Sequence, residues 1–232
     1  MKKLSIIIML VLSYSNFAFA FINNKSPNTT EHINYVSEYY NKYHLLTPRP
    51  AILTKSYLML VNKSYYVNKD YTPKNLVNPK EFGIKSANDD VLVPKEVLDQ
   101  YLKMVFELEL NNLYIFSGFR NYQKQEMLYS YYKDDNYSAR PGFSEHHTGF
   151  ALDISTKESG LEIFFSKTKE FQILINNSYK YGFILRYPME KTDETGYFFE
   201  PWHFRYVGKI HATIIFNENI SLEQYIHENF DF

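Results

Sequence analysis

Residues 144–153 read S-E-H-H-T-G-F-A-L-D, and residues 200–203 read E-P-W-H. These two stretches contain three residues that can ligate a metal ion: His146, Asp153 and His203. A catalytic zinc ion commonly takes three protein ligands from His, Asp or Glu and leaves its fourth position to water. Glu200 is a carboxylate that can take a proton from such a water molecule. Together the two stretches predict a catalytic metal site.

The segment around Asp153 has the alternating pattern of a β-strand. In F-A-L-D-I, residues 150–154, the large apolar side chains share one face, so Asp153 should point away from the core toward a site. A carboxylate in such an apolar segment needs a partner. That partner is a cation, a backbone cap or an arginine, and in the simpler alternative to a cation it is the guanidinium group of Arg120 or Arg205.

The two histidine positions leave alternatives open. Pro141 and Gly142 predict a turn, so His146 should lie on a loop entering the strand, where it is either a ligand or a surface residue. His147 competes for the ligand role, and spacing does not separate the two histidines.

The E-P-W-H stretch needs a bend for its polar residues to converge. Strand residues three apart face opposite sides, and Pro201 supplies a break that brings Glu200 and His203 together. In the alternative, Trp202 is a core anchor and the two polar residues lie at a rim.

Arg120 is expected to contact substrate. It ends S-G-F-R (117–120), between a predicted strand at 113–116 and a predicted helix at 121–133. A guanidinium group can bind a carboxylate in bidentate fashion or stabilise a tetrahedral oxyanion. Gln125 belongs to the same candidate site, and Ser144 can donate a hydrogen bond to the same carboxylate. The alternatives are a surface salt bridge for Arg120 and a turn residue for Ser144.

The whole chain suits one exported domain. Its 232 residues are 45% hydrophobic and contain no cysteine, so the fold needs a real core without disulfides or zinc thiolates. Residues 1–20 combine two lysines, a short apolar run and A-F-A, as in a secretory signal peptide, the alternative being an uncleaved membrane anchor. Residues 21–52 are expected to form an arm or stalk with a helix at 31–43, and residues 53–232 the domain. A net charge of −1 gives no reason to expect a nucleic-acid partner.

The remaining pattern predicts an α+β fold because strands and helices are segregated. Loops are expected at 68–79 and 187–196. Strands are predicted at 57–61, 113–116, 150–154, 182–185 and 197–207, and further helices at 94–108, 169–181, 209–216 and 221–228.

These residues resemble the D-alanyl-D-alanine carboxypeptidase family of the VanY type, among the DD-peptidases related to the zinc-binding Hedgehog fold. The resemblance runs from about residue 60 to the C-terminus. Its motifs are L-V-N-K (60–63), Y-T-P-K-N-L-V (71–77), S-G-F-R-N-Y-Q-K-Q (117–125), P-G-F-S-E-H-H-T-G-F-A-L-D-I (141–154), Y-K-Y-G-F-I-L-R-Y-P (179–188) and T-G-Y-F-F-E-P-W-H-F-R-Y-V-G (195–208).

The resemblance implies an antiparallel sheet flanked by helices with a Zn²⁺ site on the sheet. It implies zinc ligation by His146, Asp153 and His203. It further implies that Glu200 acts as general base and later proton donor, and that Arg120, Gln125 and Ser144 recognise substrate. His147 departs from the glutamine or other polar residue expected there.

The reaction implied is removal of the terminal D-alanine from peptidoglycan stem peptides, with D,D- or L,D-specificity. The enzyme is expected to be a monomer outside the cell, in the wall or on the periplasmic side of the membrane. Peptidoglycan endopeptidase activity is one alternative. Another is a non-catalytic, zinc-stabilised module that binds wall peptides, although such a module would not need Glu200 or Arg120.

Overall fold

The computed structural model describes residues 49–50, 56–135 and 137–230. The predicted signal, almost all of the predicted arm and the helix expected at 31–43 lie outside these residues. Within the described part of the chain, no helix is long and apolar enough to cross a membrane.

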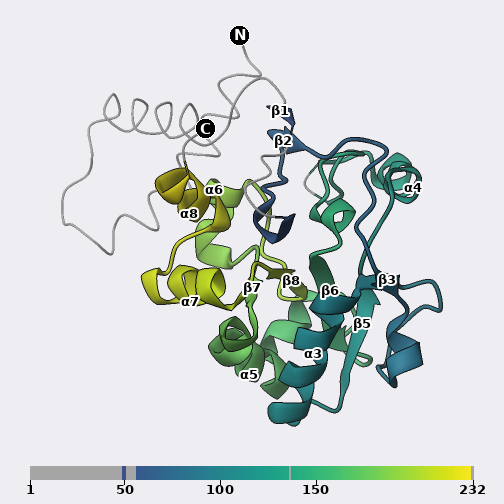
Figure 1. Cartoon of the computed structure of the whole chain (residues 1–232), viewed down its shortest axis with the longest axis vertical. Coiled ribbons are helices and arrows are strands. Elements are labelled where there is room, and N and C mark those ends of the chain that lie inside the picture. Colours follow the sequence, from purple (N-terminus) through teal and green to yellow (C-terminus); the bar gives the residue numbers. More distant parts are fainter. Residues whose placement is uncertain (1–48, 51–55, 136, 231–232) are drawn as a thin grey trace. The chain divides into compact units, whose positions relative to one another are not determined.

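The described residues form the β-strands and α-helices that follow, most of which are labelled in Figure 1. The helices are α3 (Lys95–Glu107), α4 (Tyr122–Tyr132), α5 (Lys169–Asn177), α6 (Thr192–Thr195), α7 (Lys209–Glu218) and α8 (Leu222–Asn229). The strands are β1 (Arg49–Pro50), β2 (Tyr65–Tyr66), β3 (Leu76–Val77), β4 (Val93–Pro94), β5 (Leu113–Ser117), β6 (Ala151–Thr156), β7 (Phe183–Leu185) and β8 (His203–Tyr206). Short 3-10 helices are η1 (Ser56–Leu58), η2 (Pro79–Phe82), η3 (Glu145–Thr148), η4 (Ile163–Lys167), η5 (Ser178–Tyr181) and η6 (Met189–Lys191).

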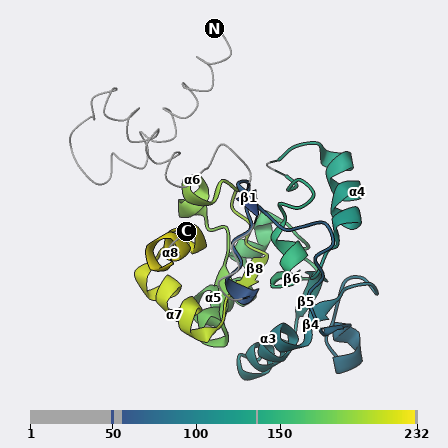
Figure 2. The ribbon, with the colours of Figure 1, turned by 45° about the horizontal axis from the view of Figure 1, so that its top comes forward.

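The main sheet has four strands in the order β5-β6-β8-β7, and every neighbouring pair is antiparallel. Figures 1 and 2 show α7 and α8 on the β7 side of this sheet and α4 on the opposite side, beyond β5. The predicted α+β class and antiparallel sheet are confirmed. In the register, Asp153 of β6 lies opposite His203 of β8, so two predicted ligands are cross-strand neighbours.

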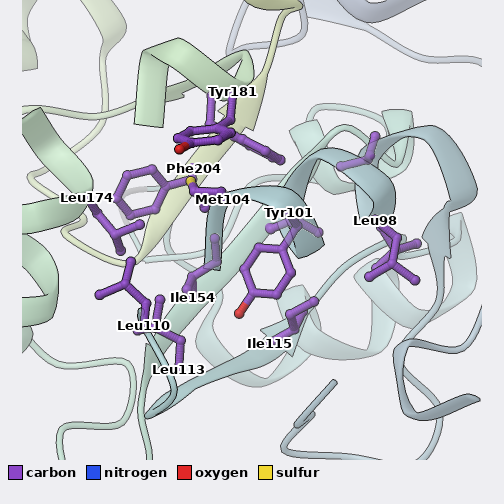
Figure 3. Packing of buried hydrophobic residues seen from close by; sticks show 14 of the residues in the cluster. Leu98, Tyr101, Met104, Leu110, Leu113, Ile115, Ile154, Leu174, Tyr181 and Phe204 are labelled. Atoms are coloured by element: carbon purple, nitrogen blue, oxygen red, sulfur yellow. The ribbon is translucent and has the colours of Figure 1, made fainter. Parts of the chain in front are cut away.

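The core lies against one face of the sheet. Leu152 and Ile154 of β6 and Phe204 of β8 are fully buried in one apolar cluster with the inner face of α3. Figure 3 shows Ile154 and Phe204 in this cluster together with Tyr101 and Met104 of α3. Each such side chain contributes roughly 1.5–3 kcal/mol by leaving water. Because side chains alternate along a strand, Asp153 and His203 are directed to the other face, as the 150–154 pattern predicts.

Two strand predictions are wrong or too long. Residues 57–61 do not form a strand: η1 ends at Leu58, and the buried residues after it are irregular. The carbonyl oxygens of Tyr57 and Met59 accept hydrogen bonds from Arg205 instead of from a neighbouring strand. The apolar run at 57–61 therefore indicates that the segment is buried, and it does not indicate that the segment pairs with a strand.

The second long strand prediction, 197–207, is reduced to β8 because a turn precedes His203. The predicted loop at 187–196 contains η6 and α6, and the helix predicted at 169–181 ends as α5 at Asn177 and continues as η5. The other predicted helices and strands in the described part are confirmed, with ends that differ by a few residues.

Candidate metal centre

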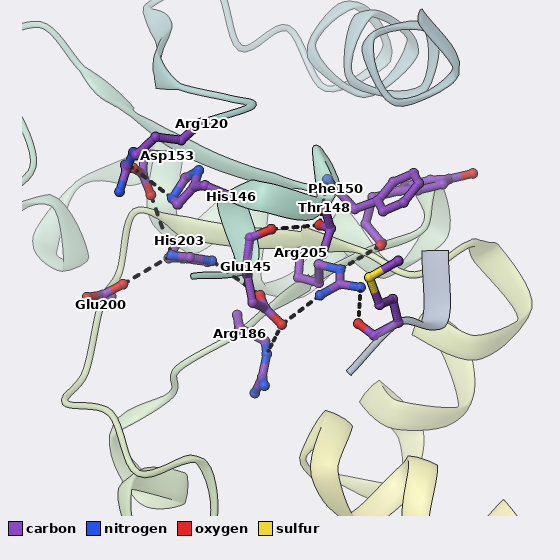
Figure 4. Close-up of polar contacts among 12 residues, drawn as sticks. Arg120, Glu145, His146, Thr148, Phe150, Asp153, Arg186, Glu200, His203 and Arg205 are labelled. Carbon is purple, nitrogen blue, oxygen red and sulfur yellow. Dashed lines mark hydrogen bonds and ion pairs between the residues drawn. The ribbon is translucent and has the colours of Figure 1, made fainter. Parts of the chain in front are cut away.

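The three predicted ligands come together in one buried place. His146 comes from η3, Asp153 from β6 and His203 from the start of β8, and one ligand atom from each lies within 4.8 Å of the others. His146 Nε2 is 3.2 Å from Asp153 Oδ2, and His203 Nδ1 is 3.6 Å from Asp153 Oδ1. Figure 4 shows the three side chains pointing toward one another. The sheet register and η3 therefore build the group predicted from sequence.

The chemistry of these residues fits a zinc ion. Two imidazole nitrogens and one carboxylate are a known ligand set for a catalytic zinc. Asp153 Oδ1 is buried and has no hydrogen-bond partner among the described residues, a deficit that a cation would satisfy. His146 Nδ1 is 2.8 Å from the Gly118 carbonyl oxygen, and donating there leaves the Nε2 lone pair facing Asp153.

The charges of the site favour an ionised carboxylate. Burial opposes ionisation of Asp153, but His146, His203 and Arg120 outweigh it and lower the pKa of Asp153 to about 2. Burial likewise opposes a charged His203, yet Glu145, Glu200 and Asp153 raise the pKa of His203 to about 9. Three carboxylates thus stabilise a positive charge on the His203 imidazole. A bound metal ion would replace the proton that carries this charge.

His147 lies outside the candidate metal group, so the geometry favours His146 over His147 as the ligand. Its Nδ1 is 2.6 Å from the carbonyl oxygen of Arg120, and its Nε2 accepts a hydrogen bond of 2.9 Å from the backbone N–H of Gly142. Its ring also stacks on Tyr122. With both ring nitrogens occupied, His147 joins two loops beside the site.

Glu200 reaches the site through the expected bend. The backbone N–H of His203 donates to the Glu200 carbonyl oxygen across the turn at Pro201. Glu200 Oε2 lies 3.1 Å from His203 Nδ1, and the Glu200 side chain is 23% exposed. Trp202 is half-buried against the core, so a core role for Trp202 and convergence of Glu200 and His203 occur together.

Arg120 lies at the edge of the same group. Its side chain is 15% exposed, and one guanidinium nitrogen is 3.8 Å from Asp153 Oδ2. Arg120 also donates to Gln125 Oε1 at 2.8 Å and to Ser117 Oγ at 3.0 Å. This hydrogen bonding fixes the guanidinium beside the ligands.

Gln125 and Ser144 are both buried. The Gln125 amide donates to Ser138 Oγ and to the Ala139 carbonyl oxygen while its oxygen accepts from Arg120, so the structure places it as a support of Arg120. Ser144 precedes η3, and its carbonyl oxygen accepts from the His147 N–H. Direct substrate contact by Gln125 and Ser144 stays a prediction.

Sequence reasoning missed a buried carboxylate beside the ligands, Glu145. It contacts Arg186, Arg205 and His203 (Figure 4). Two signals were present: Glu145 directly precedes His146, and Arg205 follows His203 at strand spacing on the same face of β8. Arg205 thus pairs with Glu145, whereas Asp153 has Arg120 as its arginine neighbour.

An antiparallel sheet with a His–Asp–His group beside a glutamate and an arginine defines a metallopeptidase class of site. Residues 91–209 match the VanY family model, described as D-alanyl-D-alanine carboxypeptidase. The chain is 35% identical over 220 residues to YodJ of Bacillus subtilis (strain 168), which covers 89% of this chain and 80% of that protein. The chain belongs to the D-alanyl-D-alanine carboxypeptidase family of the VanY type.

Solved structures agree with this assignment. The LdcB LD-carboxypeptidase aligns with a TM-score of 0.68 and 34% identity, covering 75% of this chain and 86% of that one. A D,D-pentapeptidase VanY from a VanB-type vancomycin resistance cassette, solved with Zn(II), aligns with a TM-score of 0.59 and 28% identity over 74% of this chain and 99% of that one. The expected Hedgehog/DD-peptidase type of fold is confirmed.

Proposed function

We propose that this chain is a zinc-dependent carboxypeptidase that removes the terminal D-alanine from peptidoglycan stem peptides. The observation that carries the proposal is the convergence of His146, Asp153 and His203 with Glu200 at one buried centre. Family membership supports the substrate class, since the relatives with solved structures include a D,D-pentapeptidase and an LD-carboxypeptidase.

In the proposed reaction His146, Asp153 and His203 hold the zinc ion. When bound, zinc supplies a Lewis acid that acidifies a water molecule and polarises the scissile carbonyl. Glu200 takes a proton from the attacking water as its oxygen bonds to the carbonyl carbon. Glu200 then gives that proton to the leaving amine as the C–N bond breaks. The partial exposure of Glu200 at the edge of the site suits a group that must meet both water and substrate.

Arg120 is proposed to bind the substrate carboxylate. Its guanidinium group is held by Gln125 and Ser117 and retains partial exposure, so it can present a planar pair of donors. The carboxylate bound there is the C-terminal carboxylate of the peptide. Binding of this group restricts a carboxypeptidase to the last peptide bond. The alternative role, stabilising the tetrahedral oxyanion, is supported by the position of this guanidinium 3.8 Å from Asp153 Oδ2, beside the candidate metal group.

We further propose that the protein is exported by residues 1–20 and acts as a monomer on the wall, outside the cell or on the periplasmic side of the membrane. The location of peptidoglycan supports this, as does the signal-like sequence. N-terminal sequencing of the mature protein would locate the cleavage site, and light scattering would give the oligomeric state.

The test of the proposed function is Glu200→Gln. This change keeps the side chain's shape and removes its ability to carry the proton, so hydrolysis of a stem pentapeptide and tetrapeptide should fall by about 10²–10⁴-fold. Zinc content and thermal stability should stay close to wild type. Glu190→Gln, in the exposed η6 turn, is the matched control and should leave turnover unchanged.

Unchanged turnover in Glu200→Gln would contradict the role of Glu200. Zinc binding by the wild-type protein with no release of alanine, but with cutting of cross-links in intact sacculi, would favour the endopeptidase. Zinc binding with no cleavage of any substrate would favour the binding module.

A further inference from the structure

Glu145 is a buried carboxylate that the proposed reaction does not use. Its side chain has no exposed surface, and it directly precedes the ligand His146 in η3. An ionised group so deep in a protein is costly unless it is paired and hydrogen-bonded. Its contacts therefore indicate what it does.

The two carboxylate oxygens of Glu145 have different neighbours. Oε1 accepts a hydrogen bond of 2.7 Å from Arg186 and another of 2.7 Å from Arg205. Oε2 lies 3.4 Å from His203 Nε2, which is an ion-pair distance and long for a hydrogen bond. Neither Oε2 nor Nε2 has a hydrogen-bond partner elsewhere in the described part of the chain. Each is thus the nearest available partner of the other.

The opposite side of the His203 ring faces the metal group. His203 Nδ1 is 3.6 Å from Asp153 Oδ1 and 3.1 Å from Glu200 Oε2. If Nε2 carries the proton, Nδ1 has its lone pair free for a cation. If Nδ1 carries the proton, ligation through Nδ1 is blocked.

We propose that Glu145 is a positioning residue for His203: its Oε2 accepts a hydrogen bond from the Nε2–H, which keeps the proton on Nε2 and leaves the Nδ1 lone pair available for the metal ion. The proposal rests on the zinc role assigned to His203 under the proposed function. Ligating histidines commonly donate their second ring N–H to a carboxylate, and loss of such a partner typically costs 10–100-fold in metal affinity or activity.

Two arginines fix the orientation of the Glu145 carboxylate. Arg186 and Arg205 both bind Oε1, which leaves Oε2 directed at His203 (Figure 4). Arg205 is itself fixed by the carbonyl oxygens of Tyr57 and Met59. The irregular buried segment that was predicted as a strand thus supports the residue that holds Glu145.

The chain offers a matched control in Glu223 of α8. Glu223 is also buried and accepts two hydrogen bonds from Arg186, at 2.8 and 2.6 Å, and one from Asn62 at 3.1 Å. It belongs to the same ion network, but within the described residues its hydrogen bonds and ion pairs go to Arg186 and Asn62 and not to His203. A variant at Glu223 disturbs the network and leaves the Glu145–His203 contact in place.

The experiment compares Glu145→Gln and Glu223→Gln with the wild-type protein. Zinc affinity is measured by competition with a chromophoric chelator, and folding by circular dichroism. The side-chain signals of His203 in the zinc-loaded protein are recorded by ¹H–¹⁵N NMR. We expect zinc affinity to fall 10–100-fold in Glu145→Gln and to stay within threefold of wild type in Glu223→Gln. The Nε2–H signal of His203 should shift or broaden only in Glu145→Gln.

Equal loss of affinity in both variants, or none in Glu145→Gln, would overturn the proposal. If Glu145→Gln does not fold, Glu145→Asp retains the charge between the arginines and shortens the reach to His203. The same affinity loss is then expected, and wild-type affinity would overturn the proposal. Wild-type protein that binds no zinc would overturn this proposal and the metal assignment together, whereas zinc binding without peptide cleavage would contradict the proposed function alone.

Discussion

Each ring nitrogen of His146, His147 and His203 has its own neighbour, and these neighbours decide which rings can ligate a metal ion. His146 is oriented by the Gly118 carbonyl oxygen and His203 has Glu145 on its far side, so each directs one nitrogen toward Asp153. Both ring nitrogens of His147 form hydrogen bonds with backbone groups, one of Arg120 and one of Gly142. Adjacent residues in the sequence therefore have separate tasks.

The hydrogen bonds of His147 require a neutral ring, which predicts a pH effect on stability. Burial lowers the pKa of His147 to about 4, below its usual 6.5. As the pH falls below about 6.5, His147 binds a proton in the unfolded chain but stays neutral in the folded protein. The free energy of unfolding therefore decreases between about pH 6.5 and 4. Between pH 7.5 and 5 the loss should be about 2 kcal/mol.

His147→Gln keeps a donor and an acceptor but does not titrate, so it should lack this loss. Urea unfolding of metal-free wild type and variant at the two pH values checks the difference. Parallel changes in the free energy of unfolding would contradict a neutral, buried His147.

The sequence did not predict whether His146 or His147 faces the metal group, and the reason is physical. The choice depends on hydrogen bonds to backbone groups of residues 118, 120 and 142, whose positions follow from the fold. By contrast, Asp153 was placed correctly on the side of the strand away from the core, because alternation is a local property. Glu145 was missed because its partners lie 41 and 60 residues away.

At the scale of elements, the end of β5 supports the site. The pairing of β5 with β6 shifts register between Ile115 and Ser117, and Gly118 follows directly. A Cβ atom on Gly118 would collide with the Leu92 carbonyl oxygen and lie 2.9 Å from Val93 Cγ2. The absence of a side chain lets the loop approach the 92–93 backbone while its carbonyl oxygen meets His146.

Gly118→Ala should therefore weaken both folding and metal binding. Overpacking against backbone is expected to cost about 1–3 kcal/mol, and displacement of the Gly118 carbonyl should lower zinc affinity. Gly160→Ala is the control: its Cβ meets open space, and only its positive φ of 58° costs stability. Thermal melts and chelator competition on both variants test this. Equal zinc affinity in the two would show that the carbonyl does not orient His146.

Elements with a clear period were predictable and the buried irregular segment was not. The 3.6-residue spacing identified α3, whose Val97, Leu98 and Tyr101 are buried as expected. Residues 57–61 are as apolar as a strand, but their carbonyl groups bond to a distant arginine. Hydrophobic periodicity indicates which face of a segment is buried. It does not indicate which group donates hydrogen bonds to the backbone carbonyl oxygens of that segment.

For the whole molecule, a buried ion network connects the C-terminal helix to the metal centre. Glu223 of α8 and Glu145 of η3 share Arg186, and Glu145 faces His203. The chain has no cysteine, so packing and this network must hold the fold without disulfides, and an ion bound at the candidate site would add to them.

Zinc should therefore stabilise the protein as a whole. A ligand that binds only the folded state at 1,000 times its Kd adds about 4 kcal/mol to the free energy of unfolding. Adding zinc to metal-free protein should raise the melting temperature by several degrees, and Asp153→Asn should abolish most of that rise because it removes the charged ligand. A full shift in Asp153→Asn would mean that zinc binds elsewhere on the chain.

The most direct test of the central claim is mass spectrometry of the purified protein incubated with pentapeptide and tetrapeptide stems, with and without chelator. We predict release of one C-terminal alanine from at least one stem, loss of that activity with chelator, and recovery on adding zinc. Release from the pentapeptide would establish D,D-specificity, and release from the tetrapeptide alone would establish L,D-specificity. Cleavage that persists after complete metal removal, or no cleavage of either stem by zinc-loaded protein, would contradict a zinc carboxypeptidase.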